Sequence, residues 1–288
     1  MPAGMGERLY APPVGPVPKE DWSQMRLIVA GVGRAGGSLA LAAHRSRHEV
    51  VGILARRELA EWAAELTELS WFEPLPAADL LVVAARDDAI SSVAEKLAPL
   101  AAAVPAAAHL SGFTSVAALR PLEEAGLLTA SFHPLQTLPD PVAGAAALAG
   151  SWVAVTAPPQ LEPVLFQLAQ SLGCRPFVLS DDAKPLYHAA ASSSSNYVVA
   201  ALAVAAGLFE LAGVPAEAAR PLTESAVRNV YERGPLEALT GPIARGDRAT
   251  VLGQLAAVDA TPYGRDFRAL AAATARLAGT SEVFPELR

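Results

Sequence analysis

Short apolar runs alternate with amphipathic segments through the first 180 residues of the chain. The apolar runs predict strands at 26–30, 50–54, 79–84, 104–109, 128–132, 151–156 and 175–179. The segments between them predict helices at 35–46, 58–68, 88–100, 114–125 and 160–172, and a proline- and glycine-containing loop at 139–150. This alternation is typical of βαβ units, so we expect an α/β fold with a doubly wound parallel sheet.

The pattern changes after Ser180, where helical spacing continues to the end of the chain. Glycine–proline breaks near 213, 234 and 241 separate the helical segments. The predicted helices are 181–213, 215–232, 247–258 and 265–278. We therefore expect the sheet domain to cover residues 25–180 and an all-α domain to cover residues 181–288.

Two segments need a separate interpretation. Residues 1–24 are rich in proline and lack the apolar core of a signal peptide, so we expect a disordered tail. The uncharged run from Ala189 to Phe209 is apolar enough to raise the question of a membrane span. Its polar stretch Ser192–Asn196 weakens a spanning helix, so we expect no membrane contact and a helix buried in the helical domain.

A run of glycines follows the first predicted strand and precedes the first predicted helix. Glycines at positions 1, 3 and 6 permit a tight turn, close approach of a pyrophosphate and close packing of the helix on the sheet. The helix N-terminus behind them favours anions. A purely structural turn is the alternative. The pattern predicts a dinucleotide site with Gly31, Val32, Gly33, Arg34, Ala35 and Gly36.

Two arginines follow the second predicted strand, where NAD sites carry an acid for the ribose 2′-hydroxyl. Arg56 and Arg57 suit a 2′-phosphate because guanidinium groups bind phosphate through paired hydrogen bonds. We therefore expect NADP(H) as the cofactor, and a solvated arginine pair is the alternative. Ala85 and Arg86 follow the central strand, where dinucleotide folds run beside the cofactor.

Four polar residues recur at a spacing of four in an alanine-rich segment. On one helix, Lys184, His188, Ser192 and Asn196 form a single stripe that lines a cleft or faces water. Because Pro185 disfavours helical backbone before it, Lys184 is expected at the helix start. The stripe provides candidate acids or bases at Lys184 and His188, and a helix cap with a packing seam is the alternative.

Further candidates follow predicted strands and so reach the ligand edge of the sheet. Ser111 and Gly112 follow one strand, and His133 ends another, where it could donate a proton or bind substrate. A structural role is the alternative for each histidine. We expect His44 and His48 to lie on the surface.

Aspartates near predicted helix starts have a simpler interpretation. Asp87 or Asp88 is expected to cap the following helix. The segment from Thr240 to Asp247 either closes a substrate pocket or forms a turn in which Asp247 is the cap.

Composition excludes several classes of function. The 288 residues carry a net charge of −7, which argues against a nucleic-acid partner. The single cysteine, Cys174, cannot form an internal disulfide, and no His/Cys cluster indicates a metal. We expect a protein of the reducing cytoplasm.

Five separated motifs resemble those of a known family. The glycine run, HLSG at 109–112, HPLQT at 133–137, KPLYHAAASSSSNY at 184–197 and LTGPIARGD at 239–247 are similar to Rossmann-like proteins with a C-terminal "domain of unknown function 2520". The resemblance covers about residues 25–279. These proteins are related to ketopantoate reductases, pyrroline-5-carboxylate reductases, β-hydroxyacid dehydrogenases and prephenate dehydrogenases.

The resemblance implies roles for particular residues. Lys184 is similar in place to the acid or base of β-hydroxyacid dehydrogenases, although His188 stands where those enzymes carry asparagine. His133 and Ser111 resemble a histidine and a serine of prephenate dehydrogenases. The relatives dimerise through their helical domains, which implies a homodimer here.

Together these features predict an NADP-dependent oxidoreductase that acts on a small keto or imino acid, with ketopantoate as the first substrate candidate. The substrate residues are expected to be Ser111, Gly112, Asn196 and Thr240. A reductase of a cyclic imine is one alternative. A non-catalytic NADP-binding sensor or assembly protein is another, because cofactor binding does not by itself establish turnover.

Overall fold

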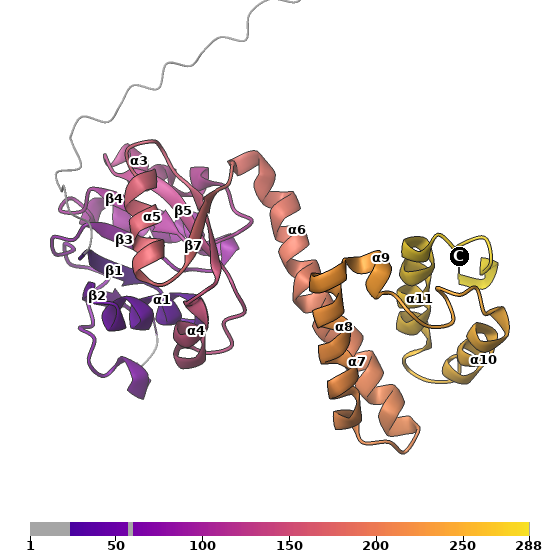
Figure 1. Cartoon of the computed structure of the whole chain (residues 1–288). Coiled ribbons are helices and arrows are strands. Elements are labelled where there is room, and N and C mark those ends of the chain that lie inside the picture. The colour runs from indigo at the N-terminus through magenta and orange to yellow at the C-terminus, as the bar shows by residue number, and fades with distance from the viewer. Residues whose placement is uncertain (1–23, 57–59, 288) are drawn as a thin grey trace, which may run out of the picture. The chain divides into compact units, whose positions relative to one another are not determined.

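A computed structural model describes residues 24–56 and 60–287 (Figure 1). The chain divides into two compact units, Met1–Ala191 and Ser192–Arg288. The expected tail lies outside the described residues except for Gln24. The division falls later than the expected boundary at 180, because the first turns of the helix that begins at Lys184 are bonded to the sheet unit.

The first unit is built on one seven-stranded sheet with the order β2-β1-β3-β4-β5-β6-β7. All neighbouring strands run parallel except β5 and β6, which are antiparallel. The strands are β1 (Arg26–Ala30), β2 (Glu49–Leu54), β3 (Leu80–Val83), β4 (Ala106–His109), β5 (Leu128–Leu135), β6 (Trp152–Thr156) and β7 (Arg175–Val178). All seven predicted strands are therefore confirmed, and the sheet is mostly parallel as expected.

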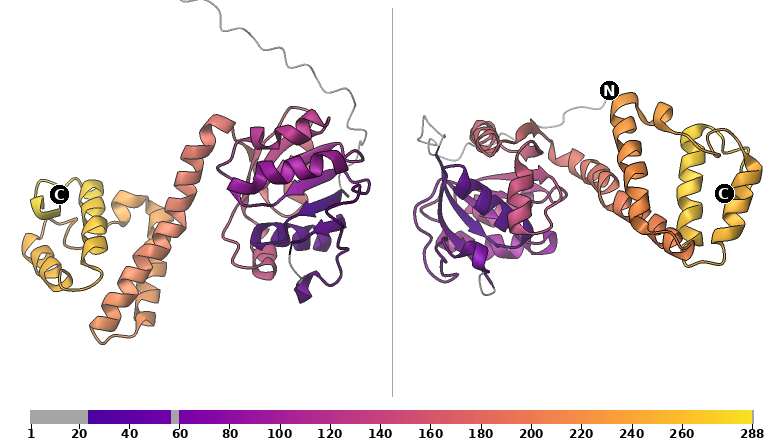
Figure 2. Two further views of the ribbon diagram at one scale, coloured as in Figure 1. Left: turned by 180° about the vertical axis from the view of Figure 1, so that it is seen from behind. Right: turned by 60° about the horizontal axis from the view of Figure 1, so that its bottom comes forward.

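Helices cover both faces of this sheet (Figure 1, Figure 2). Successive residues of β1 point to opposite faces, so Leu27 and Val29 join one apolar core while Ile28 and Ala30 join the other. Helices α1, α4 and α5 contribute to the first core, and α2 and α3 to the second. Their bounds are α1 (Arg34–Arg45), α2 (Ile90–Leu97), α3 (Arg120–Glu124), α4 (Pro141–Leu148) and α5 (Glu162–Ser171).

Two of the predicted elements in this unit are wrong. The expected helix at 58–68 is only a 3₁₀ turn, Glu61–Ala63, within the described residues, and residues 67–69 instead run beside the end of β2. The expected loop at 139–150 contains α4. Its first turn is stabilised by Pro141 at the helix start and by the Asp140 carboxylate, which accepts hydrogen bonds from two backbone N–H groups. The proline that suggested a loop thus starts a helix.

His48 is buried rather than on the surface as expected, whereas His44 is exposed as predicted. The His48 Nδ1 atom accepts a hydrogen bond from the backbone N–H of Met25 at 3.0 Å, so the neutral ring carries its proton on Nε2. This Nε2 lies 2.6 Å from the hydroxyl of Ser171 in α5. Burial lowers the pKa of His48, so the ring is neutral at neutral pH. This neutral ring joins the start of the sheet to α5 through its two contacts.

The second unit is helical, as predicted. Its helices match the predicted ones at 247–258 and 265–278 closely, and it adds the short α9. The helix expected over 181–213 is broken at Ser195, where the backbone leaves helical geometry. The bounds are α6 (Lys184–Ser194, which begins in the first unit), α7 (Asn196–Leu211), α8 (Arg220–Arg233), α9 (Pro235–Ala238), α10 (Arg248–Val258) and α11 (Gly264–Ala278).

The stretch Asp181–Leu211 is long and apolar enough to cross a membrane by length and composition, with a mean hydropathy of 1.4. This stretch includes the run from Ala189 to Phe209 that we expected to be buried in the helical domain, and that expectation is wrong for the single chain. Only 11% of its most apolar window is buried, because no described residue of this chain covers the outer face of α7.

Candidate functional site

The glycine loop connects β1 to α1 and closes tightly against the end of β3. Gly31 has a φ of +100°, and a Cβ atom there would collide with the carbonyl oxygen of Ala84. A Cβ atom on Gly36 would collide with the carbonyl oxygen of Gly31. Gly33 differs, since a Cβ atom there would meet nothing within 4 Å. Gly31 and Gly36 therefore hold the loop on the sheet, and Gly33 faces open space.

A cavity of about 500 Å³ lies in front of this loop. The first turn of α1 has no side-chain cap at Gly33, which leaves backbone N–H groups free for an anion. Of the residues predicted to bind cofactor, Gly31, Val32, Gly33, Arg56, Ala85 and Arg86 line the cavity. Arg34, Ala35 and Gly36 form the start of α1 behind it, and Arg57 lies outside the described residues.

Two tryptophans also line the cavity, and the sequence did not single them out. Trp62 lies in the segment that was expected to be a helix at 58–68, and Trp71 follows that segment. The guanidinium carbon of Arg56 lies 6.0 Å from the centroid of the Trp71 ring. No pattern in the sequence pairs Arg56 with Trp71. Their contact depends on residues 67–69 lying beside the end of β2, which brings Trp71 back to Arg56.

The loop after β3 contributes charge near the cavity. Arg86 forms an exposed ion pair of 3.0 Å with Asp88. The expectation that an aspartate caps α2 is wrong, because α2 begins after Ala89 with no side-chain cap. Asp87 instead acts electrostatically on His133.

His133 lies beyond the carboxyl end of β4, because His109 at that end pairs with Ser131 of β5. Its Nδ1 atom lies 2.8 Å from the phenol oxygen of Tyr187 in α6. A Cβ atom on Gly112 would lie 2.7 Å from the His133 ring, so only glycine lets the HLSG loop pack against this histidine. The structure thus brings His133 and Gly112 together as a site and adds Tyr187.

Burial sets the protonation of this pair. It lowers the pKa of His133 to about 4, with a further contribution from the nearby His188. It raises the pKa of Tyr187 to about 12. At neutral pH the pair is therefore a neutral imidazole and a protonated phenol, which together hold a transferable proton. His188, which follows Tyr187 in α6, packs edge-on against Phe113, with ring centroids 5.9 Å apart.

Tyr187 was missed because the spacing-of-four pattern selected only Lys184, His188, Ser192 and Asn196. Its position directly before His188 was the available signal. The stripe itself is interrupted, since Asn196 begins α7 after the break at Ser195. Asn196 and Thr240 are both exposed in the second unit, and Asp247 caps α10 through the backbone N–H of Thr250.

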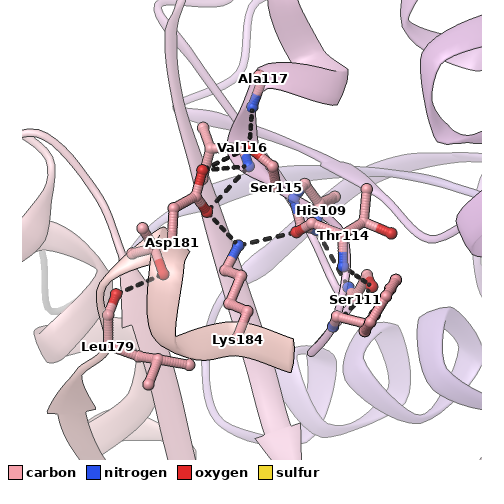
Figure 3. A network of polar contacts seen from close by, with 11 residues as sticks. His109, Ser111, Thr114, Ser115, Val116, Ala117, Leu179, Asp181 and Lys184 are labelled. Atoms are coloured by element: carbon pink, nitrogen blue, oxygen red, sulfur yellow. Dashed lines mark hydrogen bonds and ion pairs between the residues drawn. The ribbon is translucent and has the colours of Figure 1, made fainter. Parts of the chain in front are cut away.

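Lys184 is buried in a polar network that joins α6 to the loop after β4 (Figure 3). Its ammonium donates to the carbonyl oxygen of Thr114 at 2.9 Å and pairs with Asp181 at 2.9 Å. The Asp181 carboxylate also accepts hydrogen bonds from the hydroxyl of Ser115 and the backbone N–H of Val116. Burial lowers the pKa of Lys184, although Asp181 opposes the shift.

The pKa of the Asp181 carboxyl is lowered as well, although burial acts on it in the opposite direction. Burial alone would raise the pKa of Asp181, but hydrogen bonds from Ser115, Lys184 and Val116 outweigh burial and lower it. The two charged groups are therefore fixed by one another and by the loop. Lys184 stands at the helix start, as Pro185 indicated, and its ammonium is engaged within the protein.

The HLSG loop is held by its own side chains. Nδ1 of His109 accepts a hydrogen bond from the backbone N–H of Ser111 at 3.1 Å. The Ser111 hydroxyl accepts from the backbone N–H groups of Phe113 and Thr114 at 3.1 and 2.9 Å. Burial, followed by the charge of Lys184, lowers the pKa of His109 to about 3, so this ring is neutral and structural. In these contacts the Ser111 hydroxyl serves as an acceptor that shapes the loop.

No group of three or more His, Cys, Asp or Glu side chains is placed to hold a metal ion within residues 24–56 and 60–287. Cys174 is buried beside Ser151 and the carbonyl oxygen of Leu148, and burial raises its pKa. That environment is typical of a structural thiol.

Comparisons with known proteins agree with this architecture. Residues 14–134 match the family described as "Rossmann-like domain", and residues 151–274 match the "Domain of unknown function (DUF2520)". No curated protein sequence matches the chain. Solved structures supply the remaining comparisons.

A Bacteroides fragilis protein provisionally named an NADP oxidoreductase is 21% identical, with a TM-score of 0.76, and the match covers 89% of this chain and 100% of that one. Pyrroline carboxylate reductase of Plasmodium falciparum, solved with NADP bound, is 14% identical with a TM-score of 0.59, over 90% and 99% of the two chains. An imine reductase of Streptomyces aurantiacus is 18% identical with a TM-score of 0.57, over 91% and 99%.

At these identities the structural likeness establishes the fold, and the two family matches identify the parts of the sequence that form it. The same two parts were expected from the five motifs. The chain thus combines an N-terminal part that matches the Rossmann-like domain with a C-terminal part that matches the family "Domain of unknown function (DUF2520)".

Proposed function

We propose that this protein is an NADP-dependent oxidoreductase that transfers a hydride between NADPH and a small keto or imino acid. One observation carries the proposal: the cavity at the glycine loop and the His133–Tyr187 pair both lie at the carboxyl edge of the parallel strands. Ligands of open α/β sheets bind at that edge. The names of the three solved neighbours, an NADP oxidoreductase, a pyrroline carboxylate reductase and an imine reductase, support the same class of reaction.

The residues at the glycine loop fit a dinucleotide. Gly33 leaves room for a pyrophosphate in front of the uncapped start of α1, where backbone N–H groups favour an anion. We assign the 2′-phosphate to Arg56 in the cavity wall and, from the sequence, to Arg57. When bound, NADPH supplies the hydride, and the protein orients it and handles one proton.

We assign the proton to the His133–Tyr187 pair. Reduction of a C=O or C=N bond requires a proton on the substrate oxygen or nitrogen. The phenol and the neutral imidazole share one hydrogen bond, so the pair gives one proton to the substrate and takes one proton back from solvent to restore its starting state. This assignment replaces the hypothesis that Lys184 is the acid, because its ammonium is buried against Asp181 and Thr114. In the proposal, Lys184 positions the start of α6, which carries Tyr187.

The experiment is NADPH oxidation by the purified protein with a panel of keto acids, ketopantoate included, and cyclic imines such as pyrroline-5-carboxylate. We expect turnover with at least one member, and a loss of about 10²-fold or more in Tyr187→Phe with unchanged NADPH affinity. Tyr197→Phe is the matched control, because it removes a phenol oxygen that lies outside both the cavity lining and the His133–Tyr187 pair. NADPH binding without turnover across the panel would contradict catalysis and favour the sensor function.

We further propose that a second copy of the chain covers α7 and α8. Their exposed apolar side chains are Tyr197, Val198, Val199, Leu202, Leu211, Leu222, Val227, Val230 and Tyr231. A patch of this kind marks a protein or membrane contact. The start of the apolar stretch favours a protein contact, because Asp181, Lys184 and Tyr187 are bonded to the sheet unit and are not free to enter a bilayer.

A further inference from the structure

Arg56 follows β2 in the cavity wall, where we assigned the 2′-phosphate, and its side chain lies against an aromatic ring. The guanidinium carbon is 6.0 Å from the centroid of the Trp71 ring, and both residues line the cavity in front of the glycine loop. A guanidinium group over an indole face is attracted by the π system and keeps its N–H edge free for hydrogen bonds. Arg56 is thus supported on one side and open at its edge.

The Trp71 ring is itself held in place by the backbone of β2. Its Nε1–H group donates to the carbonyl oxygen of Ala55 at 2.7 Å. Two further hydrogen bonds of 2.8 Å, from Ile53 to Thr67 and from Leu69 to Ile53, pin the segment before Trp71 beside the end of β2. The ring and Arg56 therefore move with the same strand.

We propose that Trp71 is a positioning residue that holds the Arg56 guanidinium at the 2′-phosphate of NADPH and so sets the preference for NADPH over NADH. The inference rests on the proposed function. A free arginine loses side-chain entropy when it binds phosphate, and an arginine already supported by an anchored ring loses less. The gain applies to NADPH alone, because NADH has no 2′-phosphate for Arg56 to bind.

The same chain provides a matched control. Arg175 lies over Trp152 with its guanidinium carbon 5.9 Å from the ring centroid, at the first residues of β7 and β6. Neither residue lines the cavity. Trp152→Leu therefore removes an equivalent arginine–tryptophan contact without touching the proposed cofactor site.

The test is calorimetric titration with NADPH and with NADH, which does not depend on turnover. In Trp71→Leu we expect the ratio of the two affinities to fall by about threefold to tenfold. Trp152→Leu should leave the ratio unchanged. In an Arg56→Ala background, Trp71→Leu should have no further effect on the ratio, because the residue that it positions is gone.

The outcomes separate the two proposals. A wild-type protein that binds both cofactors equally would overturn the proposed NADP specificity itself. A wild-type preference for NADPH that survives in Trp71→Leu, or an equal drop in the Arg56→Ala background, would overturn the role of Trp71. If Trp71→Leu fails to fold, Trp71→Phe keeps a ring under Arg56. Trp71→Phe should then retain most of the ratio of NADPH affinity to NADH affinity. Complete loss of the preference for NADPH in that variant would contradict the proposal.

Discussion

His109, Ser111 and Lys184 show how the fold already uses several residues of the kind that catalyse reactions. Each makes at least one hydrogen bond that holds the loop after β4 or joins it to α6. His133 and Tyr187 differ, because their mutual hydrogen bond leaves a transferable proton in a pair that is only partly buried. At the residue scale, the candidate chemistry therefore lies in this pair.

Gly33→Val tests the cofactor loop. The side chain would enter the open space in front of α1, so we expect NADPH affinity to fall more than tenfold while the thermal unfolding temperature changes little. Gly36→Ala is the contrasting variant, because its methyl group would collide with the Gly31 carbonyl and destabilise the fold. Normal NADPH binding by Gly33→Val in calorimetry would show that the pyrophosphate lies elsewhere.

Lys184→Ala tests whether this lysine is structural. It leaves Asp181, one-third exposed, without its cation, so we expect a loss of roughly 2–3 kcal/mol in the free energy of unfolding. The exposed Arg86–Asp88 pair is the control, and Arg86→Ala should cost less than about 1 kcal/mol. Urea unfolding measures both. Unchanged stability with a large loss of turnover would restore Lys184 as the catalytic acid.

At the scale of elements, the strands were the most predictable features because each is a short apolar run between polar segments. The helices of the second unit were predictable too, because helical spacing of apolar residues continues between the glycine–proline breaks. The segment at 58–68 was misjudged because helical spacing was present but pairing of Leu69 with Ile53 drew the chain along β2. The antiparallel direction of β6 was not predicted either, because alternation of strands and helices does not specify the direction of a strand.

Three histidines at strand ends, of which His48 and His109 are buried and His133 is half-buried, predict acid sensitivity of the sheet unit. Burial lowers the pKa of His48, of His109 to about 3 and of His133 to about 4, from 6.5 in the unfolded chain. At a pH between the folded and the unfolded pKa values, the unfolded chain binds more protons than the folded chain. Stability is therefore full above about pH 6.5 and falls as the pH drops toward 4, by up to about 1.4 kcal/mol per pH unit for each histidine.

Urea unfolding between pH 7.5 and about 5 measures this slope. His48→Gln should reduce it, since one buried titrating group is removed. A stability that stays constant or rises on acidification would contradict the burial of these rings.

At the scale of the whole molecule, the sequence predicted the two-part architecture and the glycine loop, because both depend on local patterns. It did not predict the partners of Arg56 and His133. Trp71 and Tyr187 reach them through strand pairing and through the binding of α6 to the sheet unit, contacts between residues far apart in the chain. Motif spacing selects residues that share one helix face, so it passed over Tyr187.

The proposed dimer is a prediction at this scale. Sedimentation without detergent should give twice the mass of the 29.7 kDa chain, and Val199→Asp together with Leu202→Asp should give a monomer with unchanged helix content. Asp substitutions on the exposed face of α8 at Leu222 and Tyr231 should act in the same direction. A wild-type monomer, or a protein that requires detergent and floats with lipid vesicles, would contradict the dimer.

The central claim is that the cavity at the glycine loop binds NADPH through its 2′-phosphate. Calorimetric titration of the wild-type protein with NADPH and NADH tests it most directly. A charge-assisted hydrogen bond contributes about 1.5–3 kcal/mol, so we predict at least about tenfold tighter binding of NADPH and a preference that is largely lost in Arg56→Ala. Equal affinities for the two cofactors, or no binding of either, would contradict the account.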